Sequence, residues 1–165
     1  MKHILIIGGG SIGKRHAKNL HDLGCQVSVV DPREDRRNEL DIYTYTYKDL
    51  QVNPACFDAV IDATPPASHL ENCIWAAMNK LPILCEKGIT LDLEEARQIE
   101  RVVGEYKIPF LMGYTWRWWP TLNKLFDEHI KLIEPLRRVE MRMCANLEDW
   151  HPWEPLRDRK STRLN

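Results

Sequence analysis

The chain has 165 residues, which suits one α/β domain of ordinary size with a short remainder. About 44% of its residues are apolar and 28% are charged, which excludes the disordered and collagen-like classes. The net charge of -1 gives no basic footprint for nucleic acid, and no apolar run approaches the ~18 residues that a membrane span needs.

The cysteines and histidines are scattered along the chain. The five cysteines, at positions 25, 56, 73, 85 and 144, form no C-x-x-C pair, which is typical of reduced thiols packed as small apolar side chains. No histidine has the H-E-x-x-H spacing, so we expect no metal site. The first residues run straight into glycines instead of a signal-peptide cleavage site, and we therefore expect a cytoplasmic protein.

Up to Pro120 the sequence predicts strands that alternate with helices. Apolar runs predict the strands, and apolar positions at helical spacing predict the helices. In chain order, we expect strand 2–7, helix 12–23, strand 26–30, strand 57–63, helix 69–80, strand 82–85, helix 92–106 and strand 108–113. Helix-length segments between strands favour parallel pairing, which predicts an α/β fold with a doubly wound parallel sheet of the Rossmann type.

Three local features refine this pattern. Gly24 is expected as the residue that ends the first helix. The segment Tyr43 to Tyr47 alternates tyrosine with threonine and is interpreted as an edge strand or an extended connector. Asp92, with Glu95 three residues later, predicts a capping box. The apolar positions of the helix that follows are expected to face inward: Leu93, Ala96, Ile99, Val102 and Val103.

Beyond Pro120 the pattern changes. Residues 121–133 predict a helix with four apolar side chains facing inward: Leu122, Leu125, Phe126 and Ile130. Residues 136–144 alternate apolar and charged positions, which predicts a half-buried strand, the first of a truncated α+β second domain. We therefore expect a first domain over residues 1–120 and a linker helix with the start of a second domain over residues 121–158. The tail at residues 159–165 departs from the pattern and is expected to be non-native.

A glycine-rich turn follows the first strand. Gly8, Gly10 and Gly13 satisfy G-x-G-x-x-G between that strand and the first helix. In this context the first glycine permits a tight turn, the second lets a diphosphate approach the backbone, and the third lets helix and strand pack closely. The first helical turn, which includes Ser11 and Ile12, presents N–H groups and the positive end of the helix dipole to phosphates. These five residues are therefore predicted to bind a dinucleotide cofactor.

Asp31 ends the second predicted strand and bears on the choice of cofactor. It lies 18 residues after Gly13, close to the ~20 expected for a carboxylate that bonds the adenosine ribose; the alternative is that it merely begins a turn. A carboxylate here repels a 2′-phosphate and favours NAD, whereas Arg33, Arg36 and Arg37 would accommodate NADP unless they form a solvated face. We prefer NAD, with NADP as the alternative and Arg33 as a further cofactor-binding residue.

Three further motifs make the pattern specific. Residues 63–69 (Ala-Thr-Pro-Pro-Ala-Ser-His), 85–88 (Cys-Glu-Lys-Gly) and 113–120 (Gly-Tyr-Thr-Trp-Arg-Trp-Trp-Pro) each follow or end a predicted strand. With the glycine loop, they resemble the glucose-fructose oxidoreductase / inositol dehydrogenase / rhizopine catabolism (Gfo/Idh/MocA) family over about residues 1–155. The resemblance implies an NAD(P)-dependent oxidoreductase that transfers hydride at the secondary alcohol of a sugar, sugar nucleotide or polyol. The expected partners are such small molecules, not nucleic acid or a membrane, and the full-length protein is expected to form homo-oligomers.

The resemblance also implies roles for single residues. Lys87 matches the family's lysine, which binds the substrate hydroxyl and relays its proton, and is the expected catalytic residue; the alternative is an exposed surface cation. Gly88 stands where the family has a proline. His69 is expected to orient its loop or to start the helix, and Arg117 lies beside the cofactor or forms a structural salt bridge. Besides Lys87, the cofactor-binding residues implied by these motifs are Thr64, Pro65, His69, Glu86 and Arg117.

One family feature has no counterpart in this sequence. Family members carry an aspartate and a histidine four positions apart in a second domain, and no histidine here has an acidic residue four positions before it. We therefore expect a truncated chain that binds cofactor with little turnover and self-associates through exposed apolar surface. The alternatives are a non-catalytic nucleotide-binding module or inactive fragment, and another Rossmann enzyme such as an amino-acid or semialdehyde dehydrogenase. Glu86 and Lys87 favour the sugar-type enzyme over the latter.

Overall fold

The computed structural model describes residues 1–40, 42–46, 54–128, 135, 137, 138, 140 and 142. The chain divides after Trp119 into two units, Met1–Trp119 and Pro120–Asn165. Within the described residues, no helix is both long enough and apolar enough to cross a membrane.

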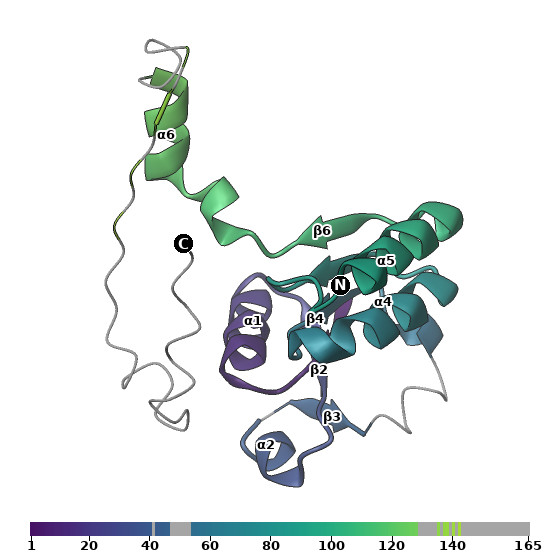
Figure 1. Ribbon diagram of the computed structural model, residues 1–165. Coiled ribbons are helices and arrows are strands. Elements are labelled where there is room, and N and C mark those ends of the chain that lie inside the picture. Colours follow the sequence, from purple (N-terminus) through teal and green to yellow (C-terminus); the bar gives the residue numbers. More distant parts are fainter. Residues whose placement is uncertain are drawn as a thin grey trace, which may run out of the picture. The chain divides into compact units, whose positions relative to one another are not determined.

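The first unit is built on a six-stranded sheet with helices packed on it (Figure 1), and β1 (His3–Ile7) occupies an interior position in the strand order. The strand order is β3-β2-β1-β4-β5-β6, and each neighbouring pair is parallel. The chain leaves β1 first toward one edge and then toward the other, which is the topology of a doubly wound Rossmann sheet and confirms the predicted fold class. The strands are β1 (His3–Ile7), β2 (Gln26–Val30), β3 (Tyr43–Tyr45), β4 (Ala59–Asp62), β5 (Ile83–Cys85) and β6 (Phe110–Met112).

Helices cover both faces of this sheet, because neighbouring residues of each buried strand point to opposite sides. On β1, Ile6 packs with Ala17 of α1, whereas Leu5 and Ile7 pack with Ile99 of α5 and with apolar residues of α4. Both clusters are buried, so the strands have the continuous apolar sequence that a doubly covered sheet requires. The helices of this unit are α1 (Ser11–Asp22), α2 (Glu34–Asn38), α4 (His69–Met78) and α5 (Leu93–Tyr106), with short 3-10 turns η1 (Pro54–Cys56), η2 (Pro66–Ser68) and η3 (Thr115–Trp118).

The ends of α1 and α5 follow the local signals in the sequence. Gly24 has a positive φ of 76° just after α1, as predicted for a helix-ending glycine. The Asp92 side chain accepts hydrogen bonds from the backbone N–H groups of Glu94 (2.7 Å) and Glu95 (3.3 Å), which confirms it as the residue that caps α5. The prediction that Leu93 faces inward is wrong, because 66% of this residue is exposed.

β3 is the edge strand that the alternating tyrosines predict. It pairs with β2 alone, with Tyr43 opposite Ser28 and Tyr45 opposite Val30. Tyr43 is exposed, while Tyr45 packs edge-on against Phe57 at a ring-centroid distance of 6.2 Å. The edge strand therefore contributes one aromatic side chain to the core. Tyr47 lies outside the described residues.

The second unit contains one described helix, α6 (Pro120–Glu128). The predicted inward orientation of its apolar residues is wrong for Leu125 and Phe126, which are both exposed. Ile130 lies outside the described residues, as does the predicted tail at residues 159–165. The predicted strand at residues 136–144 falls largely outside them too, and its four described positions are not in a strand.

Candidate cofactor-binding site

The glycine turn between β1 and α1 has two positions that only glycine fits. Gly8 has a φ of 101°, and a Cβ atom there would lie 2.8 Å from the carbonyl oxygen of Ala63. A Cβ atom at Gly13 would lie 1.8 Å from the carbonyl oxygen of Gly8, which no real side chain tolerates. The turn and the close helix–strand approach are thus those that the motif predicts.

Gly10 and the first turn of α1 leave room for an anion. Gly10 is the N-cap of α1, and no side chain caps this helix end. A Cβ at Gly10 would have only the Nη1 atom of Arg36 within 4 Å, at 3.8 Å. Backbone N–H groups at a helix start, here those of Ser11 and Ile12, favour negative charge. The loop therefore offers the space and the N–H donors that the diphosphate of a dinucleotide requires.

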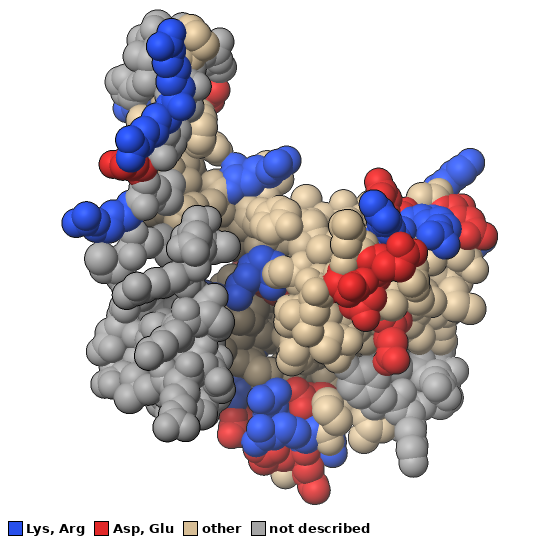
Figure 2. All heavy atoms as spheres, in the orientation of Figure 1, with Lys and Arg blue, Asp and Glu red and all other residues tan. Residues whose placement is uncertain are grey.

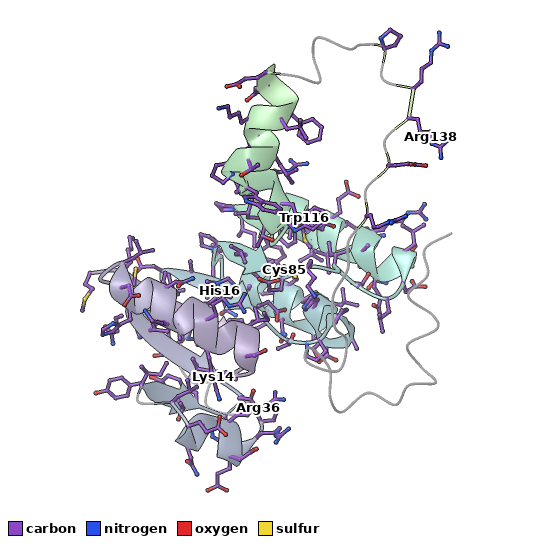
Figure 3. The ribbon with its side chains drawn as sticks, turned by 90° about the vertical axis from the view of Figure 1, so that its left-hand side faces the viewer. Lys14, His16, Arg36, Cys85, Trp116 and Arg138 are labelled. Atoms are coloured by element: carbon purple, nitrogen blue, oxygen red, sulfur yellow. The ribbon has the colours of Figure 1, made fainter. Side chains whose placement is uncertain are left out.

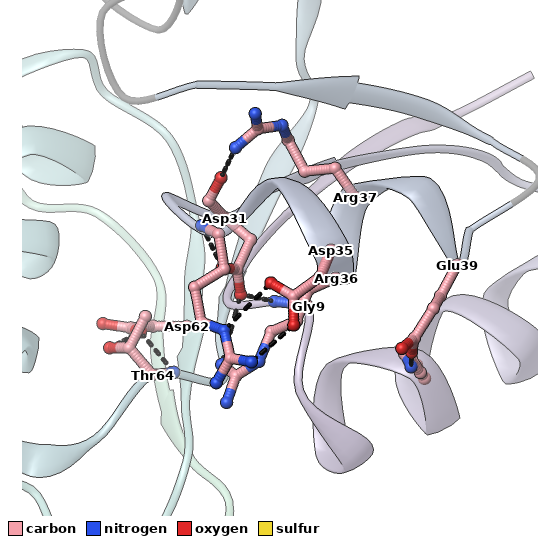
Figure 4. Close-up of polar contacts among 10 residues, drawn as sticks. Gly9, Asp31, Asp35, Arg36, Arg37, Glu39, Asp62 and Thr64 are labelled. Atoms are coloured by element: carbon pink, nitrogen blue, oxygen red, sulfur yellow. Dashed lines mark hydrogen bonds and ion pairs between the residues drawn. The ribbon is translucent and has the colours of Figure 1, made fainter.

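Asp31 is buried at the end of β2, and its side chain accepts hydrogen bonds from the glycine loop and from the start of α2 (Figure 4). Its Oδ2 atom accepts a hydrogen bond from the N–H of Gly9 at 2.8 Å, and its Oδ1 atom accepts one from the N–H of Arg33 at 2.8 Å. Arg37 donates to the Asp31 carbonyl oxygen at 2.7 Å. The carboxylate therefore braces the glycine loop against the start of α2. A carboxylate oxygen can accept more than one hydrogen bond. The hydrogen bond between Asp31 and the ribose stays a prediction.

The arginines that follow Asp31 belong to a mixed-charge helix. Arg33 directs its guanidinium to Asp35, with which it forms an ion pair, and contacts Asp31 through its backbone. Arg36 places Nη1 3.4 Å from the Oδ2 atom of Asp31. Figure 2 shows basic and acidic side chains crowded together at the edge formed by α2. The arginine cluster is thus partly neutralised by its own neighbours.

Thr64 follows β4 and is held by a buried polar network. Its N–H and hydroxyl groups donate to the Oδ1 atom of Asp62 at 3.1 and 2.6 Å, and Asn72 donates to its hydroxyl oxygen at 3.1 Å. Asp62 is fully buried, and this burial raises the pKa of its carboxyl group although the hydrogen bond from Thr64 opposes the shift. Asp62 and Asn72 were not predicted as site residues. The signal available was a carboxylate that ends an otherwise apolar strand.

Glu86, the first residue after β5, is half-buried and held by polar contacts. Its Oε1 atom lies 2.9 Å from the Nε2 atom of His16, a residue of α1 that Figure 3 labels, and its Oε2 atom accepts a hydrogen bond from the N–H of Lys87 at 3.2 Å. Gly113, directly after β6, is so close that a Cβ there would lie 3.1 Å from the Cα atom of Glu86. Glu86 therefore ties the helix of the glycine motif to the turn that carries Lys87. His16 was not among the predicted site residues.

The remaining predicted residues have different surroundings. Lys87 and Arg117 are exposed, and within the described part of the chain Arg117 forms no ion pair. Pro65 precedes η2 and accepts a hydrogen bond from the N–H of Ser68 at its carbonyl oxygen. Gly88 lies beside Pro66, since a Cβ at Gly88 would be 4.0 Å from the Cγ atom of Pro66. The turns after β4 and β5 thus come together at the carboxyl edge of the sheet.

His69 is the first residue of α4 and is fully buried. Its Nε2 atom lies 2.9 Å from the carbonyl oxygen of Thr64, and its Nδ1 atom lies 2.9 Å from the carbonyl oxygen of Ile89. Both contacts are with backbone atoms of the turns after β4 and β5. This position agrees with the expected orienting role.

A group of three potential metal ligands lies under these turns. The side-chain ligand atoms of Asp62, Cys73 and Cys85 are within 4.8 Å of one another, and all three residues are buried. A hydrogen bond with Cys73, together with burial, raises the pKa of the Cys85 thiol. A thiol must lose its proton to bind a metal ion, and we assign no metal ion to the group.

Comparison with known proteins assigns this fold and its motifs to one family. The model of the Gfo/Idh/MocA oxidoreductase family, described as an NAD-binding Rossmann fold, matches residues 2–114. The chain belongs to this family. Residues 2–114 of this Gfo/Idh/MocA protein are therefore its NAD-binding Rossmann domain.

Relatives of this Gfo/Idh/MocA chain include a catabolism protein and a dehydrogenase. It is 31% identical over 128 residues to the rhizopine catabolism protein MocA of Rhizobium meliloti, covering 74% of this chain and 40% of that protein. It is 35% identical over 124 residues to scyllo-inositol 2-dehydrogenase (NAD(+)) of Bacillus subtilis, covering 70% of this chain and 36% of the relative. The chain thus spans about two fifths of the length of these relatives.

Solved structures agree with the fold. The crystal structure of myo-inositol 2-dehydrogenase from Lactobacillus plantarum has a TM-score of 0.66 and 27% sequence identity, and the match covers 76% of this chain and 41% of that chain. The similarity therefore again spans most of this chain and less than half of the compared protein.

Proposed function

We propose that this chain provides the NAD-binding part of a dehydrogenase that oxidises or reduces a secondary alcohol of a sugar, sugar nucleotide or polyol. The observation that carries the proposal is the glycine turn, where Gly8 and Gly13 allow no side chain and Asp31 holds the N–H of Gly9. The substrate class is supported by the relative that is 35% identical and named scyllo-inositol 2-dehydrogenase (NAD(+)).

Each part of the site has a proposed task. The N–H groups of the first turn of α1 bind the diphosphate, and Asp31 bonds the adenosine ribose. Thr64 and Pro65 line the cofactor, with Thr64 held in place by Asp62. Bound NAD supplies the hydride acceptor. Lys87 binds the substrate hydroxyl and relays its proton, and Glu86 positions the Lys87 turn through the N–H of Lys87.

We propose NAD rather than NADP as the cofactor. Asp31 presents a buried carboxylate where the 2′-phosphate of NADP would add negative charge. Arg36 already pairs with that carboxylate, and Arg33 pairs with Asp35. The two guanidinium groups would therefore have to leave carboxylate partners to bind a 2′-phosphate.

The proposed partners are small molecules, and we further propose homo-oligomers for the whole protein. The net charge of -1 and the mixed charges of α2 support a partner other than nucleic acid. Size-exclusion chromatography with light scattering of the whole protein tests the oligomer.

A cofactor titration tests the function. The full chain is titrated with NADH and with NADPH while cofactor fluorescence is followed, and we expect NADH to bind at least about tenfold more tightly. Asp31→Asn is expected to weaken NADH binding by about tenfold or more. The matched control is Asp35→Asn, which changes an exposed carboxylate of the same region that contacts Arg33. Circular dichroism checks that the chain is folded. If the folded chain binds neither cofactor, the proposal is wrong.

A further inference from the structure

The two ring nitrogens of His69 have the same kind of partner, which bears on its protonation state. Both ring nitrogens lie 2.9 Å from backbone carbonyl oxygens, those of Thr64 and Ile89. A carbonyl oxygen can only accept a hydrogen bond, and a neutral imidazole has a single N–H group. In a neutral ring, one nitrogen lone pair would therefore face a carbonyl lone pair. His69 is fully buried, so water would not relieve that repulsion.

We propose that His69 is a buried imidazolium and a positioning residue, which uses both of its N–H groups to hold together the turns that follow β4 and β5. One of these turns contains Thr64, and the other contains Lys87, two residues before Ile89. The two turns of the proposed cofactor site are thus held together by one charged residue. The effect of His69 on cofactor binding rests on the proposed function, whereas the protonation state of His69 does not.

The groups around His69 support a positive charge there. Asp62 faces it from β4, Cys85 faces it from β5, and Cys73 lies on its own helix. The Oδ2 atom of Asp62 has no hydrogen-bond partner among the described residues. Burial raises the pKa of this carboxyl group, and a positive charge on His69 opposes that shift. Burial alone would lower the pKa of His69, but its interactions with Cys85, with the charge of Asp62 and with the carbonyl oxygen of Thr64 outweigh burial and raise the pKa from 6.5 to about 9.

The first experiment reads the protonation state directly by NMR. The full chain is prepared with isotope-labelled histidine ring nitrogens, and the His69 signals are assigned by their loss in His69→Gln. We expect both nitrogens to carry protons at about pH 7.5, with loss of one proton centred near pH 9. A neutral tautomer at about pH 7.5 would overturn the proposal, whether or not the chain binds a cofactor.

A second variant tests the source of the charge. Asp62→Asn preserves size and leaves one carbonyl oxygen to accept from Thr64, but it removes the negative charge. We expect the midpoint for His69 to fall by about one pH unit or more. Asp22→Asn, which changes an exposed carboxylate paired with Lys18, is the matched control and should leave the midpoint unchanged. Equal midpoints in Asp62→Asn and in the unaltered chain would contradict this role of Asp62.

NADH affinity reports the positioning role. Between about pH 7.5 and about pH 10, we expect NADH affinity to fall severalfold in the unaltered chain, because one of the two carbonyl contacts is lost. His69→Gln should bind NADH less tightly at the lower pH and show a smaller pH dependence. An unaltered pH dependence in this variant would overturn the positioning role. Absence of NADH binding at every pH would instead refute the proposed function and leave the NMR result to decide the charge.

Discussion

Gly13 and Gly104 are both helical glycines with opposite surroundings. A Cβ at Gly13 would collide with the carbonyl oxygen of Gly8, whereas a Cβ at Gly104 in α5 would meet no atom within 4 Å. We expect Gly13→Ala to lower the free energy of unfolding by about 1–3 kcal/mol and to abolish NADH binding. Gly104→Ala should raise it by about 0.5–1 kcal/mol, because alanine is the better helix former. Urea denaturation measures both, and equal effects would contradict the packing described for α1.

His69 should also make stability depend on pH. Its folded-state pKa is raised from 6.5 to about 9, so its contribution is fully present below about pH 6.5 and is lost as the pH rises through 9. We expect this loss to be on the order of 2–3 kcal/mol in the free energy of unfolding. Urea denaturation at a series of pH values measures it, with His69→Gln as the comparison. A variant that loses stability with the same slope would show that another group is responsible.

The sequence predicts single residues only where their partners are close along the chain. The spacing from Gly13 is sufficient to find Asp31, yet it does not show that the carboxylate also binds Gly9 and Arg33. His16 and Glu86 meet because the sheet places α1 beside the end of β5, and no local pattern contains that information. Lys87 was predicted from the resemblance, and its catalytic role stays a prediction.

Among the elements, α5 shows how a helix start can be both predicted and tested. Asp92 satisfies two N–H groups that the helix itself leaves unpaired. We expect Asp92→Ala to lower the free energy of unfolding by about 1 kcal/mol, and Asp92→Ser to cost much less because serine also caps helices. Chemical denaturation followed by circular dichroism measures both. Equal losses in the two variants would mean that the side-chain cap is not the cause.

Helix orientation was predicted less well than helix position. The helix α5 packs through Ile99, Val102 and Val103. At 3.6 residues per turn, Leu93 lies about 120° around the helix from Ile99, outside the buried stripe. A pattern of apolar residues therefore predicted the helix correctly but included one residue too many on its inner face. The strands were predicted more reliably, because burial on both faces makes each of them a continuous apolar run.

On the scale of the whole molecule, a group of exposed aromatic residues ends the first unit. Trp118 and Trp119 are 64% and 50% exposed, and Trp116 packs only at a tilted angle to Trp119, with ring centroids 6.2 Å apart. Exposed apolar patches of this kind promote association. We expect the chain to self-associate at micromolar concentration and the double variant Trp118→Ser, Trp119→Ser to do so less. Light scattering measures both, and a monodisperse monomer of the unaltered chain would contradict the expectation.

The strand order also determines when the sheet can form during synthesis. β1 pairs with β2 and with β4, so Ile4 must meet both Val27 and Ala59 before its strand is complete. No pair of strands in this sheet is a hairpin that closes locally, and such long-range pairing slows folding. β1 therefore keeps one edge unpaired from its own synthesis until β4 has been made. Unpaired strand edges make a nascent chain prone to aggregate, and chaperones protect chains in this state.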